Sequence, residues 1–174
     1  MKKYLGVAIS SIMLSLSIPA IGAGDGLSIS SKRVKIVVSK DIKAASEKVD
    51  VIKKYEVLSR LQKEIDGQLG GFPDSTKAEI TITSFRLRSG ASGFFGMSGK
   101  DVLDATVTVK DKGKQVGRFG IDVSNGRSGK TQPPTRRLVR LIQRFGEKFN
   151  GKLNLSMGRM PGFPGGININ INRY

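Results

Sequence analysis

Three segments in the middle of the chain have the pattern of β-strands. They cover about residues 77–88, 101–111 and 115–123, are rich in β-branched residues and fit a pleated, half-buried surface. The turn Asp111-Lys112-Gly113-Lys114 joins the last two and predicts a β-hairpin. A fourth strand is predicted near 33–39, where charged and apolar residues alternate before an apolar pair.

Two other segments have the period of amphipathic helices. Apolar residues recur at steps of three and four over about 51–69 and 135–153. Gly70-Gly71 and Pro73 are predicted to end the first helix, and Thr135 to cap the second. The second helix has an apolar stripe that is expected to pack on the sheet: Leu138, Leu141, Ile142, Phe145 and Phe149.

These patterns predict the α+β class, with one sheet of about four mostly antiparallel strands and two amphipathic helices packed on one face. A chain of 174 residues is long enough for one such domain, predicted over 24–153. Residues 24–31 are small and polar and are expected to be a flexible lead-in. The tail 154–174 is rich in Gly, Pro and Asn. Its Ile/Asn alternation over 167–172 fits either a strand that docks on a partner or on this sheet's own edge, or an unstructured end.

The first 23 residues have the order of a secretory signal peptide. Lys2 and Lys3 precede an apolar run over 5–18, and small residues follow Pro19. Cleavage is expected after Gly22 or Ala23, which predicts a periplasmic or secreted protein. A membrane anchor is the alternative, but the run is shorter than the roughly 20 residues that a span needs.

Composition removes several kinds of chemistry. The chain has no Cys, His or Trp, so it has no disulfide framework, thiolate, lipid-attachment cysteine or Ser–His–Asp triad. Composition does not exclude a Ser–Lys pair, although no motif indicates one. Asp101, Asp104 and Asp122 lie near one another along the hairpin, but nothing in their surroundings separates their pKa values as paired-acid catalysis requires. We expect no enzyme activity, cofactor, metal or small-molecule substrate.

A basic face on the second helix is the first candidate binding site. The net charge is +16, and it is +14 without Lys2 and Lys3. Such a charge favours anionic partners. The basic residues opposite the apolar stripe are Arg136, Arg137, Arg140, Arg144 and Lys148. Glu147 is the only acid between Arg127 and Lys152, so the helix does not neutralise this face itself.

This basic face is consistent with three interpretations. It is a solvated charged surface, or it binds an envelope protein or an anionic membrane or cell-wall component, or it binds nucleic acid. The signal peptide and the lack of aromatic residues between the basic ones disfavour nucleic acid.

A glycine-rich loop is the second candidate. Gly90, Gly93, Gly96 and Gly99 precede a strand rather than a helix, so no phosphate-binding loop is predicted. The residues between them that are expected to contact a partner, or else to fold back over the core, are Phe94, Phe95 and Met97.

Residues 83–123 read TSFRLRSGASGFFGMSGKDVLDATVTVKDKGKQVGRFGIDV and are followed by a helix. This segment resembles a family of uncharacterised bacterial envelope proteins that share a domain of unknown function. The family is more distantly similar to the α/β domains of periplasmic accessory lipoproteins. The resemblance implies a small exported or lipid-anchored protein with a strand, a glycine-rich connection, a hairpin and a C-terminal amphipathic helix, and it implies no catalytic residues. Many members carry a lipid-attachment cysteine, which this sequence lacks.

Overall fold

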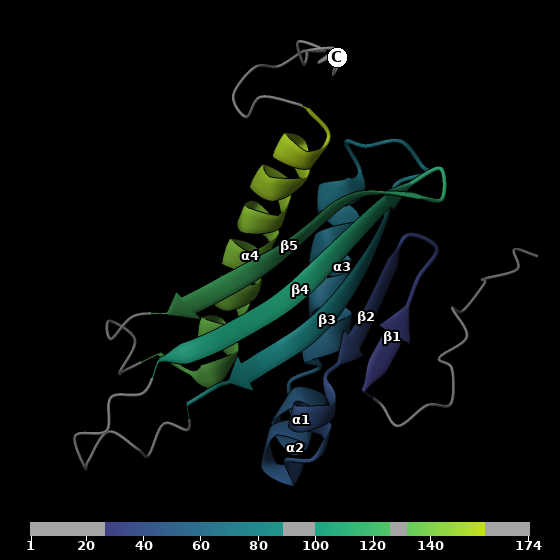
Figure 1. Ribbon diagram of the computed structural model, residues 1–174. Helices are drawn as coiled ribbons and strands as arrows, with labels where there is room; N and C mark the ends of the chain where they lie inside the picture. The colour runs from purple at the N-terminus through teal and green to yellow at the C-terminus, as the bar shows by residue number, and fades with distance from the viewer. Residues whose placement is uncertain (1–26, 89–99, 126–131, 159–174) are drawn as a thin grey trace, which may run out of the picture.

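The computed structural model describes residues 27–88, 100–125 and 132–158 as one α+β unit (Figure 1). The sheet has five strands: β1 (Ser28–Ser30), β2 (Val34–Val38), β3 (Lys77–Arg86), β4 (Asp101–Asp111) and β5 (Lys114–Asn125). The described helices are α1 (Lys40–Lys43), α2 (Ser46–Lys54), α3 (Val57–Leu69) and α4 (Pro134–Ser156). The predicted fold class is confirmed.

The strands lie in chain order, from β1 at one edge of the sheet to β5 at the other. β1 pairs antiparallel with β2, β2 pairs parallel with β3 through the helical crossover, and β3, β4 and β5 form an antiparallel meander. Lys112 and Gly113 join β4 to β5 with positive φ angles of 48° and 80°. Two positive φ values match the twist of a tight hairpin turn, as the sequence predicted.

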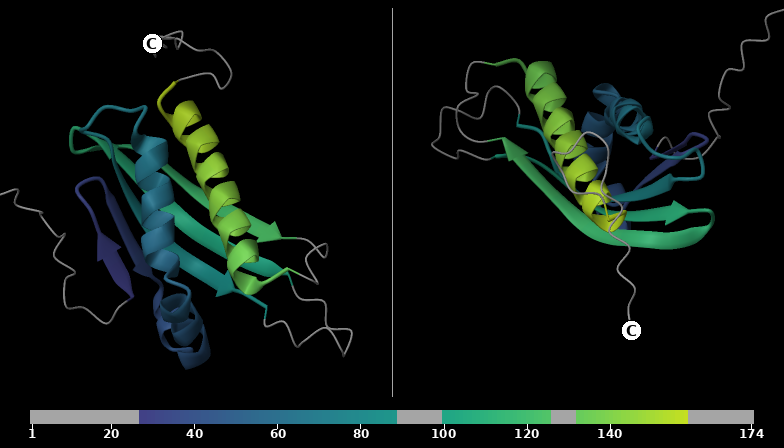
Figure 2. Two further views of the ribbon diagram at one scale, coloured as in Figure 1. Left: turned by 180° about the vertical axis from the view of Figure 1, so that it is seen from behind. Right: turned by 90° about the horizontal axis from the view of Figure 1, so that it is seen from above.

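The helices α3 and α4 cover one face of the sheet (Figure 2). β4 shows why: its buried positions alternate from Asp101 to Val109, and the residues between them are only partly buried. That period of two turns every second side chain towards the helices. All five residues of the predicted apolar stripe on α4 are buried in the same core. The opposite face of the sheet carries threonines and charged residues and has no helix over it (Figure 2).

Several predicted boundaries are wrong for identifiable reasons. The helix expected over 51–69 is two helices, α2 and α3, because Glu56 has a left-handed φ of 51° that interrupts the helical path. Part of the expected flexible lead-in is strand β1, which makes five strands rather than four. α4 begins at Pro134 with Pro133 at its N-cap, so Thr135 is not the cap, and the helix continues to Ser156.

Candidate functional site

The predicted basic face of α4 does not form a single surface, because its five cations point in different directions. Arg137 is only 5% exposed, so its placement on the solvent side of the helix is wrong. Arg144 and Lys148 turn towards the edge of β5. Arg136 and Arg140 remain exposed on the outer side of the helix.

Arg137 belongs to a buried ionic cluster. Its Nη1 lies 3.1 Å from Oδ1 of Asp101, a residue with no exposed surface, and its Nη2 donates to the carbonyl of Arg88. The backbone N–H of Arg88 also donates to Asp101 Oδ1, at 3.0 Å. A buried carboxylate is tolerated only when it is paired and hydrogen-bonded, and this one is both. The cluster joins the end of β3, the start of β4 and the first turn of α4, so Arg137 has a structural role.

Arg144 and Lys148 bind the backbone of the edge strand. Arg144 Nη1 donates to the carbonyl of Ser124 at 3.1 Å, and Lys148 Nζ donates to the carbonyl of Asp122 at 2.6 Å. These carbonyls face away from β4, on the side of β5 where the sheet ends. An open sheet edge is a template for pairing with another strand, and charged side chains are one way to block it. The two cations therefore cover the C-terminal half of β5.

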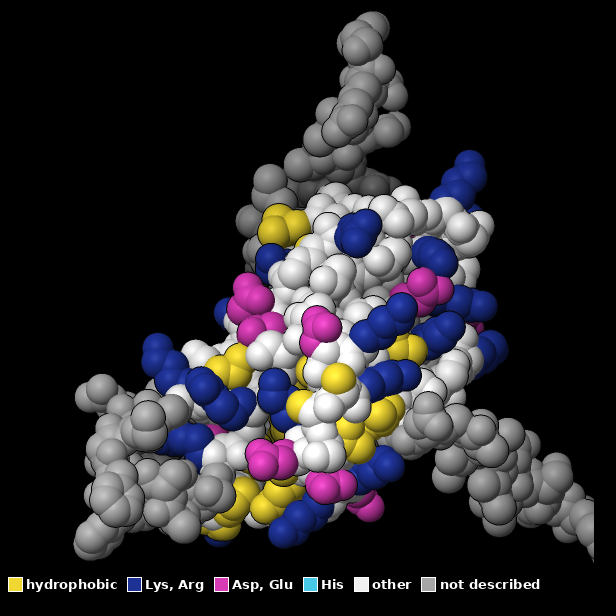
Figure 3. All heavy atoms as spheres, turned by 60° about the horizontal axis from the view of Figure 1, so that its bottom comes forward, with side chains coloured by type: hydrophobic (Ala, Val, Ile, Leu, Met, Phe, Trp, Pro, Cys, Tyr) yellow, Lys and Arg dark blue, Asp and Glu magenta, His cyan; other side chains and the backbone are white. Residues whose placement is uncertain are grey.

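Arg136 and Arg140 have no such partners. No described carboxylate lies within ion-pair distance of either guanidinium. The underside of the molecule, turned forward in Figure 3, carries Lys and Arg side chains over much of its area with Asp and Glu among them. The significance of the two unpaired arginines therefore depends on the part of the surface that lies beside them.

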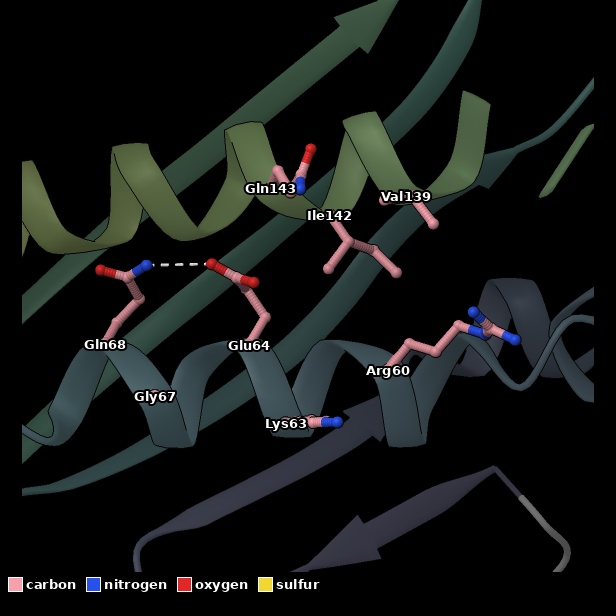
Figure 4. Close-up of a pocket in the computed structure, with 8 residues that line it drawn as sticks. All are labelled: Arg60, Lys63, Glu64, Gly67, Gln68, Val139, Ile142 and Gln143. Atoms are coloured by element: carbon pink, nitrogen blue, oxygen red, sulfur yellow. Dashed lines mark hydrogen bonds between the residues drawn. The ribbon is translucent and has the colours of Figure 1, made fainter. Parts of the chain in front are cut away.

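A groove lies between α3 and α4, and one of its lining residues, Val139, is within one turn of both arginines along α4. It encloses about 350 Å³ and is lined by residues of both helices: Arg60, Lys63, Glu64, Gly67, Gln68, Val139, Ile142 and Gln143. Ile142 points from α4 towards α3, and Glu64 and Gln68 point from α3 towards α4 (Figure 4). Val139 is 40% exposed and is one of two large hydrophobic residues with exposed side chains in the described parts of the chain. The groove thus combines an apolar floor with polar and cationic walls.

The polar wall of the groove is held by a chain of amide hydrogen bonds. Asn154 Nδ2 donates to Asn150 Oδ1 at 2.6 Å, Asn150 Nδ2 donates to Gln68 Oε1 at 2.9 Å, and Gln68 Nε2 donates to Glu64 Oε1 at 2.9 Å. Gly146 makes room for Glu64, since an added Cβ there would lie 2.7 Å from Glu64 Cγ. Glu64 is thereby held by an amide, and it forms no ion pair with a described cation, although its carboxylate remains one negative charge in the lining of the groove.

The cations that flank the apolar floor come from both helices. Arg136 lies one turn before Val139 on α4, and Lys63 lines the groove from α3. Arg60 is less available, because its Nε donates to the carbonyl of Tyr55 and its Nη2 lies 3.7 Å from Glu56 Oε2. Lys63 therefore lines the groove without an ion pair in the described structure, and Arg136 and Arg140 are unpaired cations close by along α4.

The acidic residues of the hairpin do not form one site. Asp104 and Asp122 lie opposite each other on β4 and β5, on the uncovered face of the sheet, whereas Asp101 is buried on the helix side. Burial raises the pKa of Asp104, and the charge of Asp122 raises it further, while the backbone of Val123 and the charge of Lys148 act in the opposite direction. Within the described ranges, no group of three or more Asp, Glu, His or Cys residues could hold a metal ion.

Three sequence predictions lie outside the described residues. They are the signal peptide over 1–23, the partner-contact loop with Phe94, Phe95 and Met97, and the Ile/Asn alternation over 167–172. None of the described helices combines the length and the apolar character that crossing a bilayer requires.

Comparisons with known proteins identify no family. No protein-family model matches the chain, and no curated protein matches it. The structure is similar to a candidate lipoprotein from Caulobacter crescentus CB15, at 15% identity and a TM-score of 0.43, over 75% of this chain and 90% of that one. It is also similar to a minor lipoprotein from Acinetobacter baumannii, at 11% identity and a TM-score of 0.29, over 72% of this chain and 92% of that one.

Both of these proteins are bacterial lipoproteins by name. No family model supports the envelope family itself, which stays a prediction. At these TM-scores the similarities assign no function to the chain.

Proposed function

We propose that this protein is a non-catalytic binding protein of the bacterial cell envelope that holds an acidic segment of a protein partner in the groove between α3 and α4. The observation that carries the proposal is the exposed Val139, which lines the groove together with Lys63 and lies within one turn of Arg136 and Arg140 on α4. None of these three cations has an acidic partner in the described structure. An apolar residue of the partner would contact Val139 and Ile142, and its carboxylates would meet Arg136, Arg140 and Lys63.

The shape of the site favours a protein segment over a flat anionic surface. A groove between two helices accepts side chains that project from a partner, as when an amphipathic helix docks its apolar face. A lipid or cell-wall surface would instead be drawn by charge alone and would not need an apolar groove. The apolar floor adds a contact that screening by salt does not remove.

Two features of the sequence support the rest of the proposal. The pattern of residues 1–23 supports export to the envelope. The lack of His and Cys supports a role without catalysis, because these residues supply most general bases and thiolate nucleophiles. The exported protein would then work through its surface.

A peptide-binding measurement tests the proposal. The probe is a labelled amphipathic helical peptide with leucines on one face and glutamates on the other, titrated with the full chain at low and physiological salt. We expect binding that weakens but persists as salt rises, because exposed charges are screened beyond about 8 Å at physiological ionic strength. Val139→Glu should weaken binding by about tenfold or more, equivalent to about 1.4 kcal/mol.

Leu155→Glu is the matched control, because it places the same charge at the other exposed hydrophobic residue of α4. It should leave peptide binding unchanged. Anionic vesicles and duplex DNA at the same salt separate the alternatives. Preference for DNA would favour a nucleic-acid-binding protein, and vesicle binding that Val139→Glu does not alter would favour an anionic surface. No binding of the peptide at low salt would show the proposal to be wrong.

A further inference from the structure

Side chains of the described residues cover the edge of β5 over only half of its length. Arg144 and Lys148 bind the carbonyls of Ser124 and Asp122. In an antiparallel strand, peptide groups that face the same side recur at every second residue, so Gly120 and Arg118 carry the next outward groups. No hydrogen bond from a described residue reaches these outward groups. The N-terminal half of β5 therefore presents an open edge, which can accept another strand.

An exposed hydrophobic residue lies on the same side of α4 as the two cations that cover the edge. Leu155 is 66% exposed and follows Lys148 by seven residues, which is two turns of a helix. The last turn of α4 lies against the uncovered half of β5, since a Cβ added at Gly117 would lie 2.7 Å from Ser156 Oγ. The open edge and the exposed leucine thus belong to one unfilled surface, which we call the β5 extension surface.

The described part of the chain ends beside this surface, at residue 158, shortly after α4. The sequence that follows contains Ile167-Asn168-Ile169-Asn170-Ile171-Asn172, whose period of two places three isoleucines on one face of an extended segment. Eight residues lie between 158 and 167, and the nine steps from one to the other span up to about 30 Å when the chain is extended. That reach exceeds the open half of β5, which is about five residues, or roughly 16 Å, long.

We propose that residues 167–172 pair with the open half of β5 in the same chain as a sixth strand, with the isoleucines packed on Leu155. Backbone hydrogen bonds to Arg118 and Gly120 would hold the added strand, and the alternate isoleucines would cover the exposed leucine. A short tether gives an effective concentration in the millimolar range, which favours this chain's own segment over that of a second copy. The proposal is independent of the groove, which lies on the other side of α4.

Paired cysteines test this arrangement cleanly because the chain has no other thiol. Leu155→Cys is combined in turn with a cysteine at each position from 167 to 172, and the full chain is oxidised mildly. At least one isoleucine position should form an intramolecular disulfide several-fold faster than the neighbouring asparagine positions. Val139→Cys combined with the same tail cysteine is the control and should form none.

Three results would overturn the proposal: equal rates at Ile and Asn positions, disulfides that link two chains, or no disulfide above the Val139→Cys control. Hydrogen exchange of the Gly120 amide supplies a second readout that needs no thiol. The amide should be protected in the unmodified protein, and Ile169→Pro should remove that protection while leaving Leu103, in the centre of the sheet, unchanged. An equally fast exchange of Gly120 in both proteins would also contradict the pairing.

Discussion

The two sides of α4 carry the same kinds of cation and use them in different ways. On the side towards β5, Arg137, Arg144 and Lys148 all donate to acceptors within the protein. On the outer side, Arg136 and Arg140 have no acidic partner among the described residues. The difference arises because the start of β4 and the edge of β5 offer acceptors on one side only. The elements packed around a basic helix therefore decide which of its cations bind within the protein and which remain free to bind a partner.

The largest effect is expected where a charge is buried. Arg137→Ala removes the closest side-chain partner of Asp101 and should destabilise the protein by about 3 kcal/mol, because a buried carboxylate loses half of its ion pair. Arg136→Ala, one residue earlier and exposed, should change stability by less than about 0.5 kcal/mol. Denaturant midpoints of the two variants measure the contrast, and equal midpoints would show that Arg137 is not a structural residue.

Alanine substitutions at two glycines of α4 should have smaller effects on stability, and the two effects should be opposite in sign. Gly146→Ala should destabilise the protein by about 1 kcal/mol, since its Cβ would overlap Glu64 and overpacking outweighs the gain in helix propensity. Gly151→Ala meets no atom within 4 Å and should stabilise the protein by up to about 1 kcal/mol. Thermal unfolding of both variants checks the sign, and stabilisation by both would mean that the helices are not in close contact at Gly146.

The smallest stability effect is expected at the acidic pair on the open face of the sheet. Because the pKa of Asp104 is raised in the folded state, the native protein holds that proton more tightly than the unfolded chain does. Ionisation therefore lowers stability as pH rises through the folded-state pKa. Asp104→Asn should stabilise the protein at neutral pH by less than about 1 kcal/mol, since the group is partly exposed, and the gain should vanish well below the usual Asp pKa of 3.8. A gain that persists at acidic pH would have another cause.

Much of the fold could be predicted because four of its five strands, β2 to β5, and the helix α4 show their periods directly. The alternation along β4 and the stripe through Phe145 each follow from one element by itself. The break at Glu56 could not be predicted, since a left-handed residue leaves no mark in the helical period. The register that brings β2 alongside β3 also depends on contacts distant in sequence.

The candidate site was less predictable because it is made of two helices and depends on partners elsewhere. Arg137 and Arg140 look alike on a helical projection, and only the position of Asp101 separates them. The sequence contained one signal, because the period of two places Asp101 on the same buried face of β4 as Leu103. A carboxylate that is buried in this way needs a cationic partner. Val139 gave no signal, because its exposure depends on how α3 packs.

A comparison of two double variants tests the central claim most directly. Arg136→Gln/Arg140→Gln and Arg144→Gln/Lys148→Gln each remove two positive charges from α4, but from its opposite sides. The first double variant should lose most of its binding of the acidic amphipathic peptide. Its free energy of unfolding should stay within about 0.5 kcal/mol of that of the unmodified protein. The second should keep peptide binding and lose roughly 1–2 kcal/mol of stability, because two hydrogen bonds to the edge of β5 disappear. Equal losses of binding in the two variants would contradict the account, since they would show that the peptide responds to total charge and not to the groove.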